Sequence, residues 1–160
     1  MDCTYLYNDI LITSFNFRLC NEIILKLAEK SGLGLKYNPV WLATSDKGVN
    51  YFVENYLVGD TWKAVNNTGQ VNQGRGFVDD EGRDYQELSQ AFSHFSLQDS
   101  NEQWAALDIQ GVGSTLMDPC MASVEPGLFD KANCGIRAIH RFKREHICNE
   151  YCKRLFLTKL

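Results

Sequence analysis

The sequence predicts an α+β fold in a single domain. The chain has 160 residues, of which 44% are hydrophobic and 22% charged, enough for one buried core. Two patterns alternate along it: apolar residues at helical spacing, and short apolar runs bounded by turn residues. No internal repeat and no clear linker divides the sequence, so we expect residues 1–160 to form one domain.

Helices are expected at both ends of the chain. Residues 19–31 carry apolar side chains at helical spacing, and Gly32 is a suitable stop. Residues 136–143 carry a second apolar face. A last helix is expected near the C-terminus, where the apolar face consists of Cys148, Tyr151, Cys152 and Leu155.

The middle of the chain predicts strands, a loop and a helix. Strands are expected at residues 40–43 and 51–57. Residues 66–84 are rich in Asn, Gly and Asp, which favours a long loop or the end of a hairpin. A helix should begin at Asp84, because Glu87 three residues later completes the pattern of a capping box.

Residues 91–119 contain the stretch around which the chain is organised. Residues 104–107 are apolar without alternation, as in a buried strand, although a run this short leaves a buried helical turn open. A polar, glycine-bearing loop at residues 108–113 follows, and then Asp118. Carboxylate and amide oxygens suit Mg²⁺, and glycines let the backbone approach a ligand closely. We therefore expect a site here that holds a hard cation against phosphates.

Charge is distributed unevenly. The last 30 residues hold eight Lys or Arg and two Glu, whereas the first 130 hold eight basic and eighteen acidic residues. A basic end can meet phosphate or an acidic partner, and a solvated helix face explains it equally well. The basic residues lack the interleaved aromatics of a stacking platform, which argues against a nucleic-acid partner.

The N-terminus resembles neither a signal peptide nor a membrane anchor. Asp2 and Asp9 interrupt it, and no apolar run is long enough to span a bilayer. We expect a cytoplasmic protein without a membrane partner. Six cysteines in such a chain argue for thiols or metal ligands over disulfides. Four are interpreted as ordinary apolar cysteines: Cys3, Cys20, Cys120 and Cys134.

A metal site is indicated near the C-terminus. If this segment is helical, Cys148 and Cys152 lie one turn apart on the same face, with His146 just before them. Three such ligands suit tetrahedral zinc, which needs a fourth, and His94 is the best candidate. Spacing alone leaves a second interpretation open, namely two buried thiols beside two incidental histidines. With four protein ligands, a zinc site would be structural.

Several motifs, in the right order, resemble the alpha-kinase family of atypical protein kinases. The resemblance covers roughly residues 50–156. It rests on six segments: residues 53–59, 63–69, 91–95, 108–113, 133–139 and 146–152. The resemblance implies an atypical protein-kinase-like fold with a zinc-stabilised C-terminal lobe. The N-terminal lobe is expected to be incomplete, since this chain begins near the helix that follows the family's upstream strands.

The resemblance also implies roles for single residues. Asp108 matches the catalytic aspartate, which orients or deprotonates the substrate hydroxyl. Gln110 and Asp118 match Mg²⁺ ligands, and Glu54 lies in the segment that meets the adenine. The implied activity is transfer of the ATP γ-phosphate to serine or threonine of a protein substrate, with Mg²⁺ bound. The implied ligands of structural Zn²⁺ are His94, His146, Cys148 and Cys152.

The sequence departs from the family pattern at three places, and these departures leave a second function open. The family's upstream strands carry a lysine that holds the ATP phosphates, and Lys26 and Lys30 lie on the expected helix instead. Met117 stands where the family usually has threonine. Only Gly135 remains of a glycine-rich segment, because this chain has Asp130, Ala132 and Ala138 at its other glycine positions. The alternative function is therefore a catalytically inactive, zinc-stabilised binding module.

Overall fold

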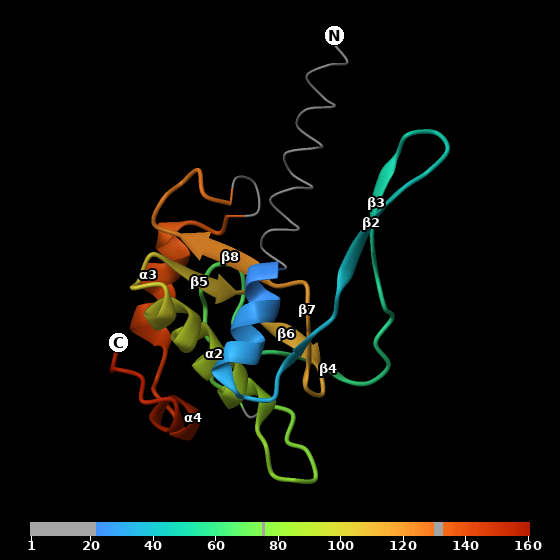
Figure 1. Cartoon of the computed structure of the whole chain (residues 1–160). Coiled ribbons are helices and arrows are strands. Elements are labelled where there is room, and N and C mark those ends of the chain that lie inside the picture. Colours follow the sequence, from blue (N-terminus) through green and yellow to red (C-terminus); the bar gives the residue numbers. More distant parts are fainter. Residues whose placement is uncertain (1–21, 75, 130–132) are drawn as a thin grey trace.

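The computed structural model describes residues 22–74, 76–129 and 133–160. Figure 1 shows these residues as a body of helices and short strands from which one β-hairpin projects. Within the described part of the chain the secondary structure is mixed, so the α+β expectation is confirmed. None of the helices in these ranges is long and apolar enough to cross a bilayer.

A four-stranded sheet lies on the side of the body that faces the hairpin (Figure 1). Its strand order is β1-β7-β6-β4, with β1 parallel to β7 and the other neighbours antiparallel. The strands are short: β1 is Lys36–Tyr37, β4 is Thr61–Lys63, β6 is Gln110–Val112 and β7 is Thr115–Met117. β4 and β7 end, and β6 begins, at the same edge of the sheet, because Gln110 lies opposite both Lys63 and Met117.

Part of the expected polar loop at residues 108–113 is strand β6, so that expectation was wrong in part. Gly111 lies in the middle of β6, and a Cβ there would collide with the Thr115 carbonyl oxygen and press on the Trp62 ring. The glycine therefore permits close pairing within the sheet, which is a different use from the approach to phosphate that the sequence suggested.

A second layer combines β5 (Trp104–Leu107), β8 (Cys120–Ser123) and α2 (Tyr85–Asp99). β5 and β8 pair antiparallel, and α2 packs against β5. Ala105, Ala106 and Leu107 are fully buried, which confirms the buried strand and excludes a helical turn.

α2 begins where the sequence predicted. The Asp84 carboxylate accepts hydrogen bonds from the backbone N–H groups of Gln86 and Glu87, at 2.9 and 3.1 Å. Such a cap satisfies two donors that the helix itself leaves free. Phe92 and His94, further along the helix, are completely buried, so the cap fixes a helix that carries a core residue and a candidate metal ligand.

The first described helix, at residues 22–31, buries Ile24, Leu27 and Ala28 as expected. Gly32 follows with a φ of +64°, a left-handed conformation that ends the helix. Residues 19–21 of the expected helix lie outside the described residues.

The projecting hairpin consists of β2 (Val40–Thr44) and β3 (Asn50–Glu54). Its register runs from Val40 opposite Glu54 to Thr44 opposite Asn50. Both strands were expected, although β3 ends at Glu54, three residues before the predicted end. Apolar side chains on this hairpin are half exposed: Trp41, Tyr51, Phe52 and Val53.

The C-terminal part contains α3 (Ile136–Glu145) and α4 (Glu150–Arg154). α3 buries Ile139 and Phe142, as the sequence predicted. The Asn149 side chain caps α4 by accepting hydrogen bonds from the backbone of Tyr151 and Cys152, at 3.0 and 3.1 Å. Cys148 therefore precedes α4. The expectation that Cys148 and Cys152 lie on the same face of one helix was wrong.

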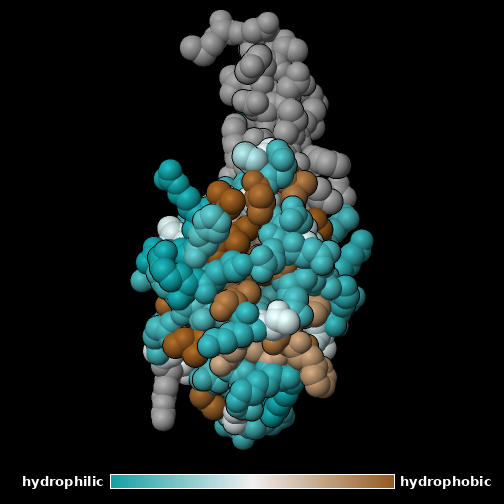
Figure 2. Space-filling view, turned by 90° about the vertical axis from the view of Figure 1, so that its left-hand side faces the viewer, coloured by the Kyte–Doolittle hydropathy of each residue, from teal (hydrophilic) through white to brown (hydrophobic). Residues whose placement is uncertain are grey.

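The side of the body away from the hairpin is mainly hydrophilic, with scattered hydrophobic side chains (Figure 2). Several basic residues near the C-terminus are paired with carboxylates. Arg141 contacts Glu145, and Lys143 contacts Glu102, at 2.8 and 2.9 Å. Part of the positive charge counted in the sequence is thus neutralised within the fold.

Cys120 and Cys134 form a disulfide across 14 residues of sequence. The expectation that both are ordinary apolar cysteines was wrong, because β8 brings the segment before α3 alongside its first residue. The backbone of Cys134 also donates a hydrogen bond to the Met121 carbonyl oxygen, at 2.8 Å. Cys3 and Cys20 lie outside the described residues.

Candidate functional site

The register of the small sheet brings three predicted site residues and one lysine to the same edge, which is called the rim below. Lys63, the last residue of β4, lies opposite Gln110, the first residue of β6. Gln110 in turn lies opposite Met117, the last residue of β7. Asp118 follows Met117 directly, and Asp108 precedes Gln110 by two residues. The register alone therefore brings Asp108, Gln110 and Asp118 to the same edge as Lys63.

The Lys63 ammonium lies 2.5 Å from the Asp108 carboxylate. The Lys63 side chain is 45% exposed and that of Asp108 only 16% exposed. Nζ of Lys63 and Oδ1 of Asp108 are close enough for a salt bridge, but their angles are not those of a hydrogen bond. Among the described residues, the buried Oδ1 of Asp108 therefore accepts no hydrogen bond. A buried carboxylate oxygen with spare acceptor capacity can receive a proton or a donor group from a ligand.

The negative charge of Asp108 acts on the Asp118 carboxyl. Loss of hydration raises the pKa of Asp118, and the negative charge of Asp108 raises it further, whereas Lys63 lowers it. A cation placed beside the Asp118 carboxylate would relieve this opposition to its ionisation. Asp118 is solvent-exposed, so such a cation could reach the pair from outside.

Both aspartates have left-handed backbone conformations. φ is +53° at Asp108 and +44° at Asp118, in a region that non-glycine residues rarely adopt. Each conformation ends a strand abruptly and turns a carboxylate to the rim of the sheet. Backbone strain of this kind is typical of functional sites, where the surrounding structure holds the residue in place.

Glu54 is connected to this rim through Asn38. The Asn38 side chain donates hydrogen bonds to the Glu54 carboxylate and to the Asn55 carbonyl oxygen, at 3.3 and 2.9 Å. The Asn38 backbone donates to the carbonyl oxygen of Leu116 in β7, at 2.8 Å. Asn38 is only 2% exposed, so it ties the base of the hairpin to the sheet. No direct contact joins Glu54 to Asp108 or Asp118 among the bonds described.

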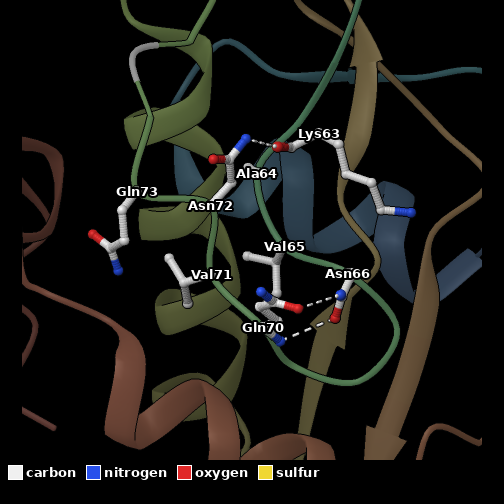
Figure 3. A pocket seen from close by; sticks show the side chains of 8 residues that line it. All are labelled: Lys63, Ala64, Val65, Asn66, Gln70, Val71, Asn72 and Gln73. Atoms are coloured by element: carbon white, nitrogen blue, oxygen red, sulfur yellow. Dashed lines mark hydrogen bonds between the residues drawn. The ribbon is translucent and has the colours of Figure 1, made fainter.

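A polar cavity of about 480 Å³ lies beyond the end of β4. It is lined by the segments 63–66 and 70–73, which face one another through the bridge between Val65 and Val71. In Figure 3 the Lys63 side chain points away from the walls formed by Val71 and Gln73. The lysine therefore contributes its backbone to this cavity and its ammonium to the aspartate rim.

The four expected zinc ligands converge. The candidate ligand atoms of His94, His146, Cys148 and Cys152 all lie within 4.8 Å of one another. Zn–S bonds of about 2.3 Å and Zn–N bonds of about 2.0–2.1 Å at a tetrahedral angle imply an S···N separation of about 3.5 Å. The two observed separations are 3.8 Å, from Cys148 to Nδ1 of His94, and 3.4 Å, from Cys152 to Nε2 of His146. The donor set and its spacing fit a tetrahedral metal ion.

The environment of the cluster also suits a metal. Burial lowers the pKa of His94 and, with the neighbouring His94 ring, lowers that of His146 to about 4. Both imidazoles are thus neutral at neutral pH, as metal coordination requires. Burial conversely raises the pKa of the Cys152 thiol to about 11, so a cation would be needed to stabilise its thiolate.

Two residues of this site were missed as functional candidates. Lys63 was noted only as part of a motif, because its approach to Asp108 depends on pairing between strands that are far apart in sequence. Asn38 had no signal, since a buried asparagine that links a hairpin to a sheet has no characteristic sequence neighbours. Asp108, Gln110 and Asp118 are brought to one rim, whereas Glu54 reaches it through Asn38.

The fold and site are those of a mixed α/β domain with two groups of potential metal ligands, one rich in carboxylate and one of histidine and cysteine. A model of the alpha-kinase family matches residues 5–152. The chain therefore belongs to the alpha-kinase family, as the motifs predicted.

Named relatives and solved structures agree with this membership. The chain is 40% identical over 109 residues to Alpha-protein kinase 1 of Dictyostelium discoideum, which covers 68% of this chain and 7% of that protein. It is 33% identical over 108 residues to the eukaryotic elongation factor 2 kinase of Mus musculus, covering 68% and 14%. The alpha-kinase domain of myosin heavy chain kinase A in complex with ADP superposes with a TM-score of 0.77 at 25% identity, covering 91% of this chain and 59% of that one. The chain thus spans only a small part of the length of these curated relatives.

Proposed function

We propose that this chain forms the catalytic centre of an ATP- and Mg²⁺-dependent protein serine/threonine kinase of the alpha type. The observation that carries the proposal is the convergence of Lys63, Asp108 and Asp118 at one rim of the sheet, with Gln110 beside them. Phosphoryl transfer depends on positioning and on neutralising phosphate charge, and these side chains can do both.

Each residue has a role that its environment supports. Asp108 would orient or deprotonate the substrate hydroxyl through Oδ1, once that oxygen is released from Lys63. Gln110 and Asp118 would hold Mg²⁺, which neutralises charge on the nucleotide phosphates when bound. The half-exposed Lys63 can exchange its contact with Asp108 for a phosphate oxygen, which would leave Asp108 available as a base. Glu54, held by Asn38, would meet the adenine.

A structural Zn²⁺ at His94, His146, Cys148 and Cys152 completes the proposal. These ligands join α2 to the segment before α4 and to α4 itself. A four-ligand site leaves no position for substrate, so its contribution would be to stability. We further propose a protein substrate, a cytoplasmic location and no membrane or nucleic-acid partner.

The alternative is a catalytically inactive, zinc-stabilised binding module. One observation favours it: the Lys63–Asp108 ion pair neutralises the proposed base. If a nucleotide cannot draw Lys63 away, the ion pair would persist and the rim would serve only to bind.

Nucleotide affinity with and without Mg²⁺ separates the two functions. Titration calorimetry with ADP should give binding that strengthens on addition of Mg²⁺. In Asp118→Asn, the factor by which Mg²⁺ increases ADP affinity should be at least tenfold smaller, because an amide cannot replace the charge of a carboxylate. Binding of ADP without Mg²⁺ should not change. Equal Mg²⁺ dependence in the two proteins would contradict the metal assignment and favour the alternative.

A further inference from the structure

Each histidine of the proposed zinc site has one ring nitrogen close to a cysteine sulfur and a second nitrogen that needs another partner. Nδ1 of His94 lies 3.8 Å from Sγ of Cys148, and Nε2 of His146 lies 3.4 Å from Sγ of Cys152. The remaining nitrogens, Nε2 of His94 and Nδ1 of His146, are buried and make no hydrogen bond among the described residues. A buried N–H without an acceptor is unfavourable, so an acceptor is expected beside each of them.

For His94 the structure offers such an acceptor, the backbone carbonyl oxygen of Thr158. Burial lowers the pKa of His94, and the Thr158 carbonyl oxygen partly offsets this shift, as an acceptor beside an imidazole N–H does. Because Nδ1 lies next to Cys148, Nε2 is the ring nitrogen that this carbonyl can serve. The two atoms do not have the geometry of a hydrogen bond, so forming one requires a closer or better aligned approach.

Thr158 is held in place by Gln98, which lies on α2 four residues after His94. Oε1 of Gln98 accepts two hydrogen bonds from Thr158, one from its backbone N–H at 2.7 Å and one from its hydroxyl at 2.8 Å. Residues four apart are neighbours on the same side of a helix, so the Gln98 and His94 side chains are neighbours on α2. Gln98 therefore restrains the residue whose carbonyl oxygen acts on the His94 ring.

The chain between α4 and Thr158 is anchored at a second proposed ligand. The backbone N–H of Leu157 donates to the carbonyl oxygen of Cys152, at 3.0 Å. Phe156 has a left-handed φ of +55°, which is unfavourable for a non-glycine residue, and 89% of its surface is exposed. Packing of the phenyl ring therefore does not hold this turn, and the bonds at Cys152 and Gln98 do.

We propose that Gln98 and Thr158 are positioning residues of the metal site, which fix the His94 ring through the Thr158 carbonyl oxygen. This inference rests on the proposed zinc site. When Nδ1 of His94 binds a metal ion, Nε2 carries the ring proton and donates it in a hydrogen bond to Thr158. Such a bond selects the tautomer and the ring orientation that coordination needs, and it makes the metal-binding nitrogen more basic.

Gln98 could instead only fasten the C-terminal residues to α2, and the two roles predict different results. In that case, losing Gln98 would lower the stability of the zinc-free and zinc-bound protein equally and leave zinc affinity unchanged. If Gln98 positions Thr158 for His94, its loss also weakens zinc binding and frees the Nε2 proton of His94. Zinc affinity and this proton therefore separate the two roles.

The test compares two substitutions at the same position. Gln98→Leu removes the acceptor, whereas Gln98→Glu keeps a carboxylate oxygen that can accept both bonds from Thr158. Thr158→Val is a milder variant for the case that Gln98→Leu folds poorly, because it removes only the hydroxyl bond. Zinc affinity is measured by competition with a chelator, and circular dichroism shows whether each protein is folded with and without zinc. Proton NMR of the zinc-bound protein observes the imidazole N–H of His94 directly, and it alone decides if the zinc-free chain unfolds.

Gln98→Leu should bind zinc about tenfold more weakly, at the lower end of the loss expected when the hydrogen-bond partner of a ligating histidine is removed. The Nε2 proton of His94 should exchange with water faster than in the unaltered protein. Thr158→Val should change both quantities in the same direction and by less. Gln98→Glu should retain the zinc affinity and the slow exchange.

An unchanged His94 proton signal in Gln98→Leu, whatever its zinc affinity, would overturn the inference and leave the zinc site in place. A loss in Gln98→Glu as large as that in Gln98→Leu would do the same. A folded, unaltered chain that binds no zinc would instead overturn the proposed zinc site, and the inference with it. The zinc content of the unaltered protein, measured first, therefore distinguishes the two failures.

Discussion

Replacing Cys148 with alanine tests the proposed zinc site with little disturbance of packing. Cys148 is half-buried, whereas Cys152 is 1% exposed, so alanine at position 148 leaves a smaller cavity. Cys148 also precedes α4, so the change does not touch the interior of that helix. Most of the effect should then come from the loss of one metal ligand.

The size of the effect follows from linkage between metal binding and folding. If loss of one of four ligands weakens zinc binding about 100-fold, the folded state loses about 2.7 kcal/mol of stabilisation at a fixed zinc concentration. For a domain of this size, 1 kcal/mol corresponds to roughly 2–4 °C in melting temperature. We expect Cys148→Ala to melt about 5–11 °C below the unaltered protein.

The assay is thermal unfolding followed by circular dichroism, with zinc measured by elemental analysis. The control is Ile147→Ala, an adjacent residue whose side chain is 70% exposed and is not a ligand. A chelator should lower the melting temperature of both proteins and bring the two values close together, because most of the difference between them comes from bound zinc. A variant that keeps one zinc per chain and melts with the control would refute the reasoning.

Three further predictions concern the rim and the packing. Lys63→Met should reduce phosphotransfer at least 100-fold and change the melting temperature little, because a half-exposed ion pair with Asp108 contributes at most about 1 kcal/mol to stability; a large loss of stability with activity retained would count against its proposed role. Asn38→Ala should weaken ADP binding equally with and without Mg²⁺, since it releases the base of the hairpin and not the metal ligands; a purely Mg²⁺-dependent loss would contradict this. Gly69→Ala should destabilise far more than Gly82→Ala in urea unfolding, because both have positive φ but only a Cβ at Gly69 would collide with the α3 backbone; equal effects would show that φ alone decides.

Local patterns predicted much of this fold because they depend on near neighbours in sequence. The cap at Asp84, the buried strand at residues 104–107 and the apolar face of α3 all followed from spacing and side-chain type. Cys148 shows the limit of such reasoning. Periodicity placed it on a helix, but the Asn149 side chain competes for the backbone and begins α4 two residues later.

The features that sequence reasoning missed depend on contacts between distant segments. The Lys63–Asp108 pair requires β4 to align with β6 in one register, and a shift by one residue would turn Lys63 to the other face. The Cys120–Cys134 bond requires β8 to lie beside the segment before α3. The convergence of the four proposed metal ligands could be predicted because three of them are close in sequence and histidines are scarce.

The most direct test of the central claim is transfer of labelled phosphate from ATP to a generic basic protein substrate in the presence of Mg²⁺. The unaltered chain should be compared with Asp108→Ala, with zinc content and melting temperature checked for both. We predict transfer to serine or threonine that Asp108→Ala abolishes while both proteins stay folded. No transfer from a folded, zinc-containing chain, or transfer that Asp108→Ala leaves intact, would contradict the proposed catalytic centre.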